Sequence, residues 1–126
     1  HDNGDVRPVL ALLDSPAYRQ LPVVVLPQSW WLILLGAYRP DLPARAPLAV
    51  GPALGPDRHI VLHDADPQTA ARRLAGVSAL AAVVCTGDPQ LARQAAAAFP
   101  ALRGFQADQV TSFDGWSVVL LHRAAG

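Results

Sequence analysis

Two strand–helix units in the middle of the chain constrain its fold more than any other sequence feature. In each unit an apolar run comes shortly before an Asp-Pro step: His59–His63 precedes Asp66-Pro67, and Leu80–Cys85 precedes Asp88-Pro89. Asp is a preferred helix N-cap, and Pro is favoured at the first helical position because its missing N–H has no partner to lose there. Each unit therefore predicts a strand followed by a helix.

The flanking segments complete the expected architecture. Asp5–Asp14 places its apolar residues at helical spacing, whereas Val23–Leu26 is a continuous apolar run typical of a strand covered on both faces. The chain ends with two runs, Phe105–Val110 and Trp116–His122, joined by Asp114-Gly115, a dipeptide typical of hairpin turns. Strands that alternate with helices predict a mainly parallel sheet. We therefore expect a small Rossmann-like α/β fold, a three-layer sandwich whose mainly parallel sheet ends in a C-terminal antiparallel β-hairpin.

Length and composition predict one domain over residues 1–126. A chain of 126 residues with 52% hydrophobic and 16% charged residues can form a core. The formal net charge is zero and no Lys/Arg cluster is present, so nucleic acid is not an expected partner. One cysteine excludes an internal disulfide. The chain has no methionine and begins at His1, from which we expect a fragment excised from a longer protein.

The most apolar stretch, Leu21–Tyr38, approaches the roughly 20 residues that a membrane-spanning helix needs. Pro27 interrupts this stretch, so we expect a buried strand followed by a short helix, and a soluble domain. Two roles are open to the aromatic residues of that helix: core packing, which is the commoner role, or contact with a membrane or an acceptor. These residues are Trp30, Trp31 and Tyr38.

Candidate metal ligands follow the first of the two repeated strands. Asp64 and Asp66 form an Asp-x-Asp pair, and nucleotide-sugar glycosyltransferases carry such a pair on a strand-end loop to hold a divalent metal and a diphosphate. Carboxylate oxygens suit Mg²⁺ or Mn²⁺, but Asp66 also has the structural role of an N-cap. His59 and His63 share one face of the same strand, with no further His or Cys at ligand spacing. We therefore assign no metal site, and retain Asp64 and Asp66 as the candidates.

The sequence gives little support for a catalytic nucleophile or for a nucleotide-binding site. Cys85 ends an apolar strand and precedes a helix start, where a thiol is either activated or, more commonly, buried and inert. The chain contains no Gly-x-Gly-x-x-Gly, no Walker loop and no Gly-x-Ser-x-Gly elbow. We therefore assign no catalytic residue and no cofactor-binding residue.

Four segments follow a recurring plan in order: DVRPVLALL, PVVVLPQSWW, RHIVLHDAD and SFDGWSVVLLHR. The plan begins with an Asp-x-Arg helix, here Asp5–Arg7, and continues with a strand that leads into an aromatic-rich helix, here Trp30–Tyr38. A later strand ends in a polar turn, and an aromatic-containing strand, here Phe113–Leu121, closes the chain. In these features nearly the whole chain resembles the soluble C-terminal domain of bacterial membrane glycosyltransferases of the GT-C type, in particular the protein mannosyltransferase and aminoarabinose transferase group. The proline-rich segment 40–58 departs from the plan, so an acceptor-contacting role there stays open.

This resemblance implies a parent protein in the cell membrane, with the present domain on the extracytoplasmic side. The implied donor is a polyprenyl-phosphate-linked sugar, used with a divalent metal. The implied partners are the transmembrane part of the same chain, that donor, and a glycan, lipid or protein acceptor. The family's acidic catalytic residue lies in a loop between early transmembrane helices, outside this chain. The fragment itself is therefore expected to be inactive, and to cover the membrane active site, help bind the acceptor or stabilise the fold.

Two other functions remain open. A free-standing, cytosolic Rossmann-like module for small-ligand binding or regulation would take its ligand at the carboxyl ends of the parallel strands. A fragment of a nucleotide-sugar enzyme would use Asp64 and Asp66 to bind Mn²⁺.

Overall fold

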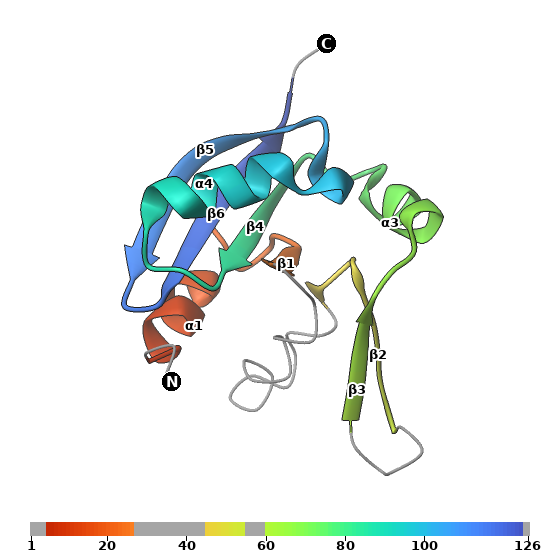
Figure 1. Cartoon of the computed structure of the whole chain (residues 1–126), viewed down its shortest axis with the longest axis horizontal. Coiled ribbons are helices and arrows are strands. Elements are labelled where there is room, and N and C mark those ends of the chain that lie inside the picture. The colour runs from red at the N-terminus through yellow and green to blue at the C-terminus, as the bar shows by residue number, and fades with distance from the viewer. Residues whose placement is uncertain (1–4, 27–44, 55–59, 125–126) are drawn as a thin grey trace.

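The computed structural model describes residues 5–26, 45–54 and 60–124 of the chain (Figure 1). Its elements are α1 (Arg7–Asp14), β1 (Val23–Leu26), β2 (Ala49–Leu54), β3 (Ile60–Asp64), α3 (Pro67–Leu74), β4 (Ala79–Val84), α4 (Pro89–Ala98), the 3₁₀ helix η3 (Pro100–Leu102), β5 (Phe105–Phe113) and β6 (Trp116–Arg123). The expected helix over Trp30–Tyr38 lies outside the described residues. The strands and helices predicted for the rest of the chain are confirmed to within a few residues at each end.

Four strands form the main sheet, in the order β1-β4-β6-β5. β1 and β4 are parallel, with Val23 opposite Ala81, whereas β4–β6 and β6–β5 are antiparallel pairs. The C-terminal hairpin is confirmed: Phe113 pairs with Trp116, and Gly115 adopts the positive φ of 79° that the tight turn requires. The chain therefore has a mixed α/β fold built on a mostly antiparallel sheet.

The three strands β1, β4 and β6 are apolar on both faces. Side chains of a strand alternate between faces, and in these strands both sets are buried. One face packs with α1 and includes Val23, Val25, Ala81, Val83, Trp116 and Val118. The other face packs with α3 and α4 and includes Val24, Leu26, Leu80, Ala82, Val84, Val119 and Leu121. This double burial explains why the strands are continuous apolar runs in the sequence.

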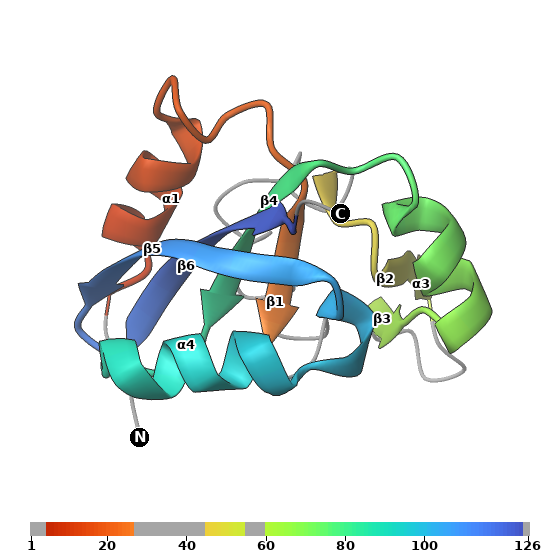
Figure 2. The same cartoon turned by 90° about the horizontal axis from the view of Figure 1, so that it is seen from above.

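Helices lie on both faces of the sheet (Figure 2). α1 buries Val9, Leu10 and Leu13 on one face, and α4 packs over β5, β6 and β4 on the other. α3 lies beside the sheet and packs against η3 (Figure 2). Both Asp-Pro steps start helices as predicted: Asp66 accepts a hydrogen bond from the N–H of Thr69, and Asp88 accepts two from the first turn of α4.

The prediction of a mainly parallel sheet is wrong for the described strands. In a parallel sheet built from the two strand–helix units, β3 would lie within the sheet, but β4 has β1 on one side and β6 on the other, so no position next to β4 remains. β3 instead pairs with β2 in a separate antiparallel ribbon that extends away from the main sheet (Figure 1). β2 ends at Leu54 and β3 begins at Ile60, so the two strands are close in the sequence and their pairing has a small entropic cost. The sheet consequently differs from the parallel sheet of a Rossmann-like fold.

β5 is an edge strand of the main sheet, and its pairing with β6 shifts register between Ala107 and Gln109. This β-bulge leaves Asp108 exposed on the strand. None of the helices in the described part of the chain has the length and apolar composition needed to span a bilayer.

Gly87, in the loop between β4 and α4, lies against the turn of the β5–β6 hairpin. A Cβ atom there would be 2.7 Å from the carbonyl oxygen of Phe113 and 3.1 Å from the nitrogen of Gly115. We predict that Gly87→Ala lowers the free energy of unfolding by about 1–3 kcal/mol, because backbone atoms must shift to admit the methyl group.

The matched control is Gly76→Ala, because a Cβ at Gly76 would meet no atom within 4 Å. Urea unfolding followed by tryptophan fluorescence measures both variants. An equal effect of the two substitutions would contradict the role of this close approach.

Candidate functional site

Of the Asp-x-Asp pair, Asp64 is the last residue of β3 and Asp66 is the N-cap of α3. Its Oδ1 accepts a 2.9 Å hydrogen bond from the N–H of Thr69, and its Oδ2 accepts a 3.0 Å bond from the Thr69 hydroxyl. These two hydrogen bonds from Thr69 lower the pKa of Asp66. Within residues 5–26, 45–54 and 60–124, no group of three or more His, Cys or acidic residues is placed to hold a metal ion. The structure thus assigns Asp66 a structural role.

We predict that Asp66→Ala lowers the thermal midpoint, whereas Asp66→Asn, which retains a capping oxygen, stays close to the parent chain. The lowered pKa means that the ionised carboxylate stabilises the fold above its ordinary pKa near 3.8, and that this contribution is lost as the pH falls through and below that value. Asp66→Asn should therefore lose less stability than the parent between pH 5 and pH 3. Scanning calorimetry with and without Mn²⁺ measures both effects, and an Mn²⁺-dependent rise that Asp66→Ala abolishes would restore the metal-site hypothesis.

Several residues singled out in the sequence fall beyond what the structure describes. Trp30, Trp31, Tyr38 and His59 lie outside the described residues, so their predicted roles stay predictions. His63 is placed by its backbone only, opposite Val50 in the β2–β3 ribbon.

Cys85 immediately follows β4, at the carboxyl end of the parallel strand pair. The thiol is half-buried, and burial raises its pKa from an ordinary value near 9 to about 11. Nearby polar groups are engaged with one another: the buried Ser117 hydroxyl donates to the carbonyl of Thr86 at 2.7 Å, and lies 2.8 Å from the Ser112 hydroxyl. The shift is in the direction of an inert thiol and away from an activated one.

At pH 8 a rise in pKa from 9 to about 11 lowers the thiolate fraction of Cys85 roughly 100-fold. The more basic thiolate is also the stronger nucleophile, which makes each thiolate about tenfold more reactive and so offsets part of the loss in thiolate fraction. We therefore predict that iodoacetamide alkylates Cys85 roughly tenfold more slowly than an unstructured cysteine peptide, and that urea unfolding removes the difference. Alkylation faster than the peptide would instead identify an activated thiol.

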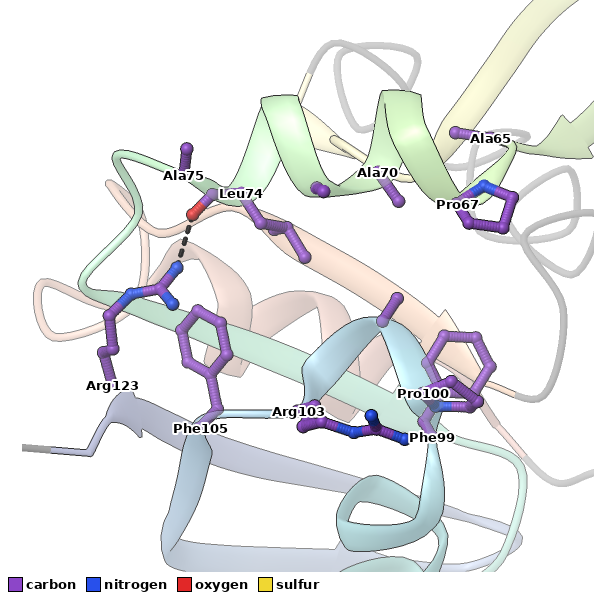
Figure 3. A pocket seen from close by; sticks show the side chains of 12 residues that line it. Ala65, Pro67, Ala70, Leu74, Ala75, Phe99, Pro100, Arg103, Phe105 and Arg123 are labelled. Carbon is purple, nitrogen blue, oxygen red and sulfur yellow. Dashed lines mark hydrogen bonds between the residues drawn. The ribbon is translucent and has the colours of Figure 1, made fainter.

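A hollow lies between α3, η3 and the start of β5. We call it the α3 cavity; it has a volume of about 450 Å³ (Figure 3). Most of its lining is apolar: Ala65, Pro67, Ala70, Ala71, Leu74, Ala75, Phe99, Pro100, Ala101 and Phe105, together with Arg103 and Arg123. A largely apolar hollow of this size with a few polar groups has the character of a small-ligand site.

The two arginines of the α3 cavity differ in their partners. Arg123 donates from Nε to the carbonyl of Val77 at 3.0 Å and from Nη2 to that of Leu74, and its guanidinium lies 4.4 Å from the ring centre of Phe105 (Figure 3). Its donors thus hold the end of α3 against the last residues of β6. Arg103 follows η3 and is exposed, and its guanidinium makes no hydrogen bond or ion pair with the described residues. Arg103 therefore supplies an available cation at the cavity.

The α3 cavity lies at the edge of the sheet where β4 begins and β6 ends. Arg123, which lines it, pairs with Phe105 and donates its N–H to the carbonyl of Ser78, just before β4. A ligand of a Rossmann-like module was expected at the opposite edge, beside the carboxyl ends of β1 and β4. Sequence reasoning missed this cavity because residues 65–75, 99–105 and 123 meet only through tertiary packing.

A second hollow, of about 350 Å³, has three arginines in its lining: Arg19, Arg45 and Arg73. Arg45 donates hydrogen bonds to the carbonyl of Leu13, near the end of α1, and to those of Tyr18 and Leu21, which follow α1. The distances are 2.8–3.3 Å. Arg73 donates to the carbonyl of Pro47 at 3.1 Å. Arg45 thereby fixes the connection between α1 and β1, which is a structural use of its guanidinium.

No protein-family model matches the chain, and comparison with characterised proteins and with solved structures also gives no match.

Proposed function

We propose that this chain is the extracytoplasmic C-terminal domain of a polyprenyl-phosphate-sugar-dependent membrane glycosyltransferase of the GT-C type. In this proposal the domain is not itself catalytic. It covers the active site formed by the transmembrane part of the same protein, or helps to bind a glycan, lipid or protein acceptor. The sugar donor and a divalent metal are bound by that other part.

The observation that carries this proposal is the Asp-x-Arg step at the start of α1. Arg7 donates from its backbone N–H to Oδ1 of Asp5 at 2.9 Å, and its Nε lies 3.0 Å from both carboxylate oxygens. Its Nη2 lies 2.8 Å from Oδ2, and the hydrogen bonds from Arg7 lower the pKa of Asp5. The two residues of the motif therefore act as one unit that fixes the entry into α1, which gives the motif a physical role.

The order of the other elements is consistent with the same plan. β1 ends at Leu26, directly before the segment with the aromatic residues, and β3 ends at Asp64 before the polar turn into α3. The closing strand β6 begins with the fully buried Trp116. These features support a helix–strand–aromatic segment–strand–hairpin plan.

We predict that an antibody against this chain detects, in cells that express its gene, a protein several times larger than 126 residues. Because the parent has many transmembrane helices in this proposal, the band should stay with membranes after high-salt and alkaline carbonate washes. Proteolysis of intact spheroplasts should remove the epitope, which distinguishes the extracytoplasmic side from the cytoplasmic one. A soluble band near the mass of the 126-residue chain would refute the proposal.

A second function is favoured by one observation, the α3 cavity. A free-standing, cytosolic module that binds a small ligand or regulates a partner would use such a hollow, although at the edge of the sheet opposite to the one expected from the sequence. The soluble-band outcome of the fractionation would favour this function.

A further inference from the structure

We propose that the α3 cavity binds an amphipathic carboxylate, with its unbranched apolar tail between α3 and η3 and its carboxylate on Arg103. This inference rests on the cavity alone and holds whether or not the chain is part of a glycosyltransferase. It assigns a ligand class to residues that no sequence motif marks.

The walls of the cavity suit an apolar tail. α3 contributes Ala70 and Leu74, which are 4% and 3% exposed, and the opposite wall contributes Phe99 and Phe105, both part-buried against the same core cluster. Figure 3 shows Leu74 directed from α3 toward the space between these walls. Apolar surface on both sides gives a tail contacts along its length, and burial of each methylene stabilises the complex.

The charges in the cavity suit an anion. Both charged residues of the lining are arginines, and no acidic residue is among them. Arg123 is held by two carbonyls and by the ring of Phe105, so its charge contributes to the local potential while its position is fixed. Arg103 has its donors available, and a guanidinium pairs with the two oxygens of a carboxylate in a planar, bidentate geometry.

The same features disfavour other ligand classes. An alkylammonium would be repelled by both arginines, and a neutral alkanol would leave the bidentate donors of Arg103 unused. A diphosphate would find one available guanidinium in an otherwise apolar lining. A ligand with an anionic head and an apolar chain can contact both the arginines and the apolar walls of the cavity.

The experiment is an NMR titration of the ¹⁵N-labelled 126-residue chain with hexanoate, octanoate, octanol and octylammonium, each below its micelle concentration. We expect saturable octanoate shifts confined to amides of α3 and residues 99–105. Each methylene should tighten binding roughly fourfold, so octanoate should bind about 15-fold more tightly than hexanoate. Octanol and octylammonium should bind at least tenfold more weakly than octanoate. Octanol binding as tightly as octanoate, or the absence of saturable shifts, would overturn the proposal.

Two pairs of variants test the residues. Arg103→Gln should weaken octanoate binding roughly tenfold and leave octanol binding unchanged, because the lost interaction is charge-assisted. Its control is Arg93→Gln, an exposed arginine of α4 outside the cavity. Ala71→Phe should block both ligands by filling the cavity, with Ala97→Phe on the exposed surface of α4 as its control.

All four substitutions are at exposed positions, and dispersed amide spectra check that each variant is folded. Equal losses in a variant and its control would refute the assignment of the site.

Discussion

Burial of the strands β1, β4 and β6 on both faces is the constraint from which the rest of the structure follows. A sheet with apolar side chains on one face needs one covering layer, whereas this sheet needs two. α1 supplies one layer and α4, with α3 beside it, supplies the other. The side chain of Ser117 is buried, and its hydroxyl donates to the carbonyl of Thr86, which ties the hairpin to the loop after β4.

The α3 cavity is a consequence of where β3 lies. In a doubly wound sheet, β3 would lie within the sheet and α3 would pack flat across it. Here β3 is in the ribbon with β2, so α3 is carried to the side of the sheet and meets η3 and Arg123. Small residues on α3, mainly alanines, leave space on that contact surface. The departure from a parallel sheet and the presence of the cavity therefore have one cause.

Local signals in the sequence were sufficient for the helices and for the hairpin. Asp66 and Asp88 cap the helices that they were expected to start, because N-capping depends on residues within one turn. Asp114-Gly115 turns the chain between β5 and β6 for an equally local reason. Local signals do not determine which strands lie next to each other in the sheet. The position of β6 between β4 and β5 depends on a hairpin that begins at Phe105, 21 residues after β4 ends at Val84. Nothing in the sequence of β3 indicates that β6 pairs with β4.

The role of a candidate site residue was predictable only where its neighbours in the sequence determine that role. The capping role of Asp66 followed from Pro67 beside it, and the raised pKa of the Cys85 thiol follows from burial, which the apolar run before it indicates. No local sequence pattern indicates that Arg103 and Arg123 line a cavity. They meet the same cavity because β5 begins opposite the last residue of β6.

The β-bulge in β5 has a consequence for how copies of this chain meet. An edge strand of nine residues exposes backbone groups on which a strand of another copy can add, and this is a common route to aggregation. The bulge interrupts the regular spacing of those groups near the middle of the strand and places the charge of Asp108 there. A strand of another copy can therefore pair only with the short stretches on either side of the bulge. The edge of the sheet stays exposed to solvent, but it is a poor template for edge-to-edge pairing between copies.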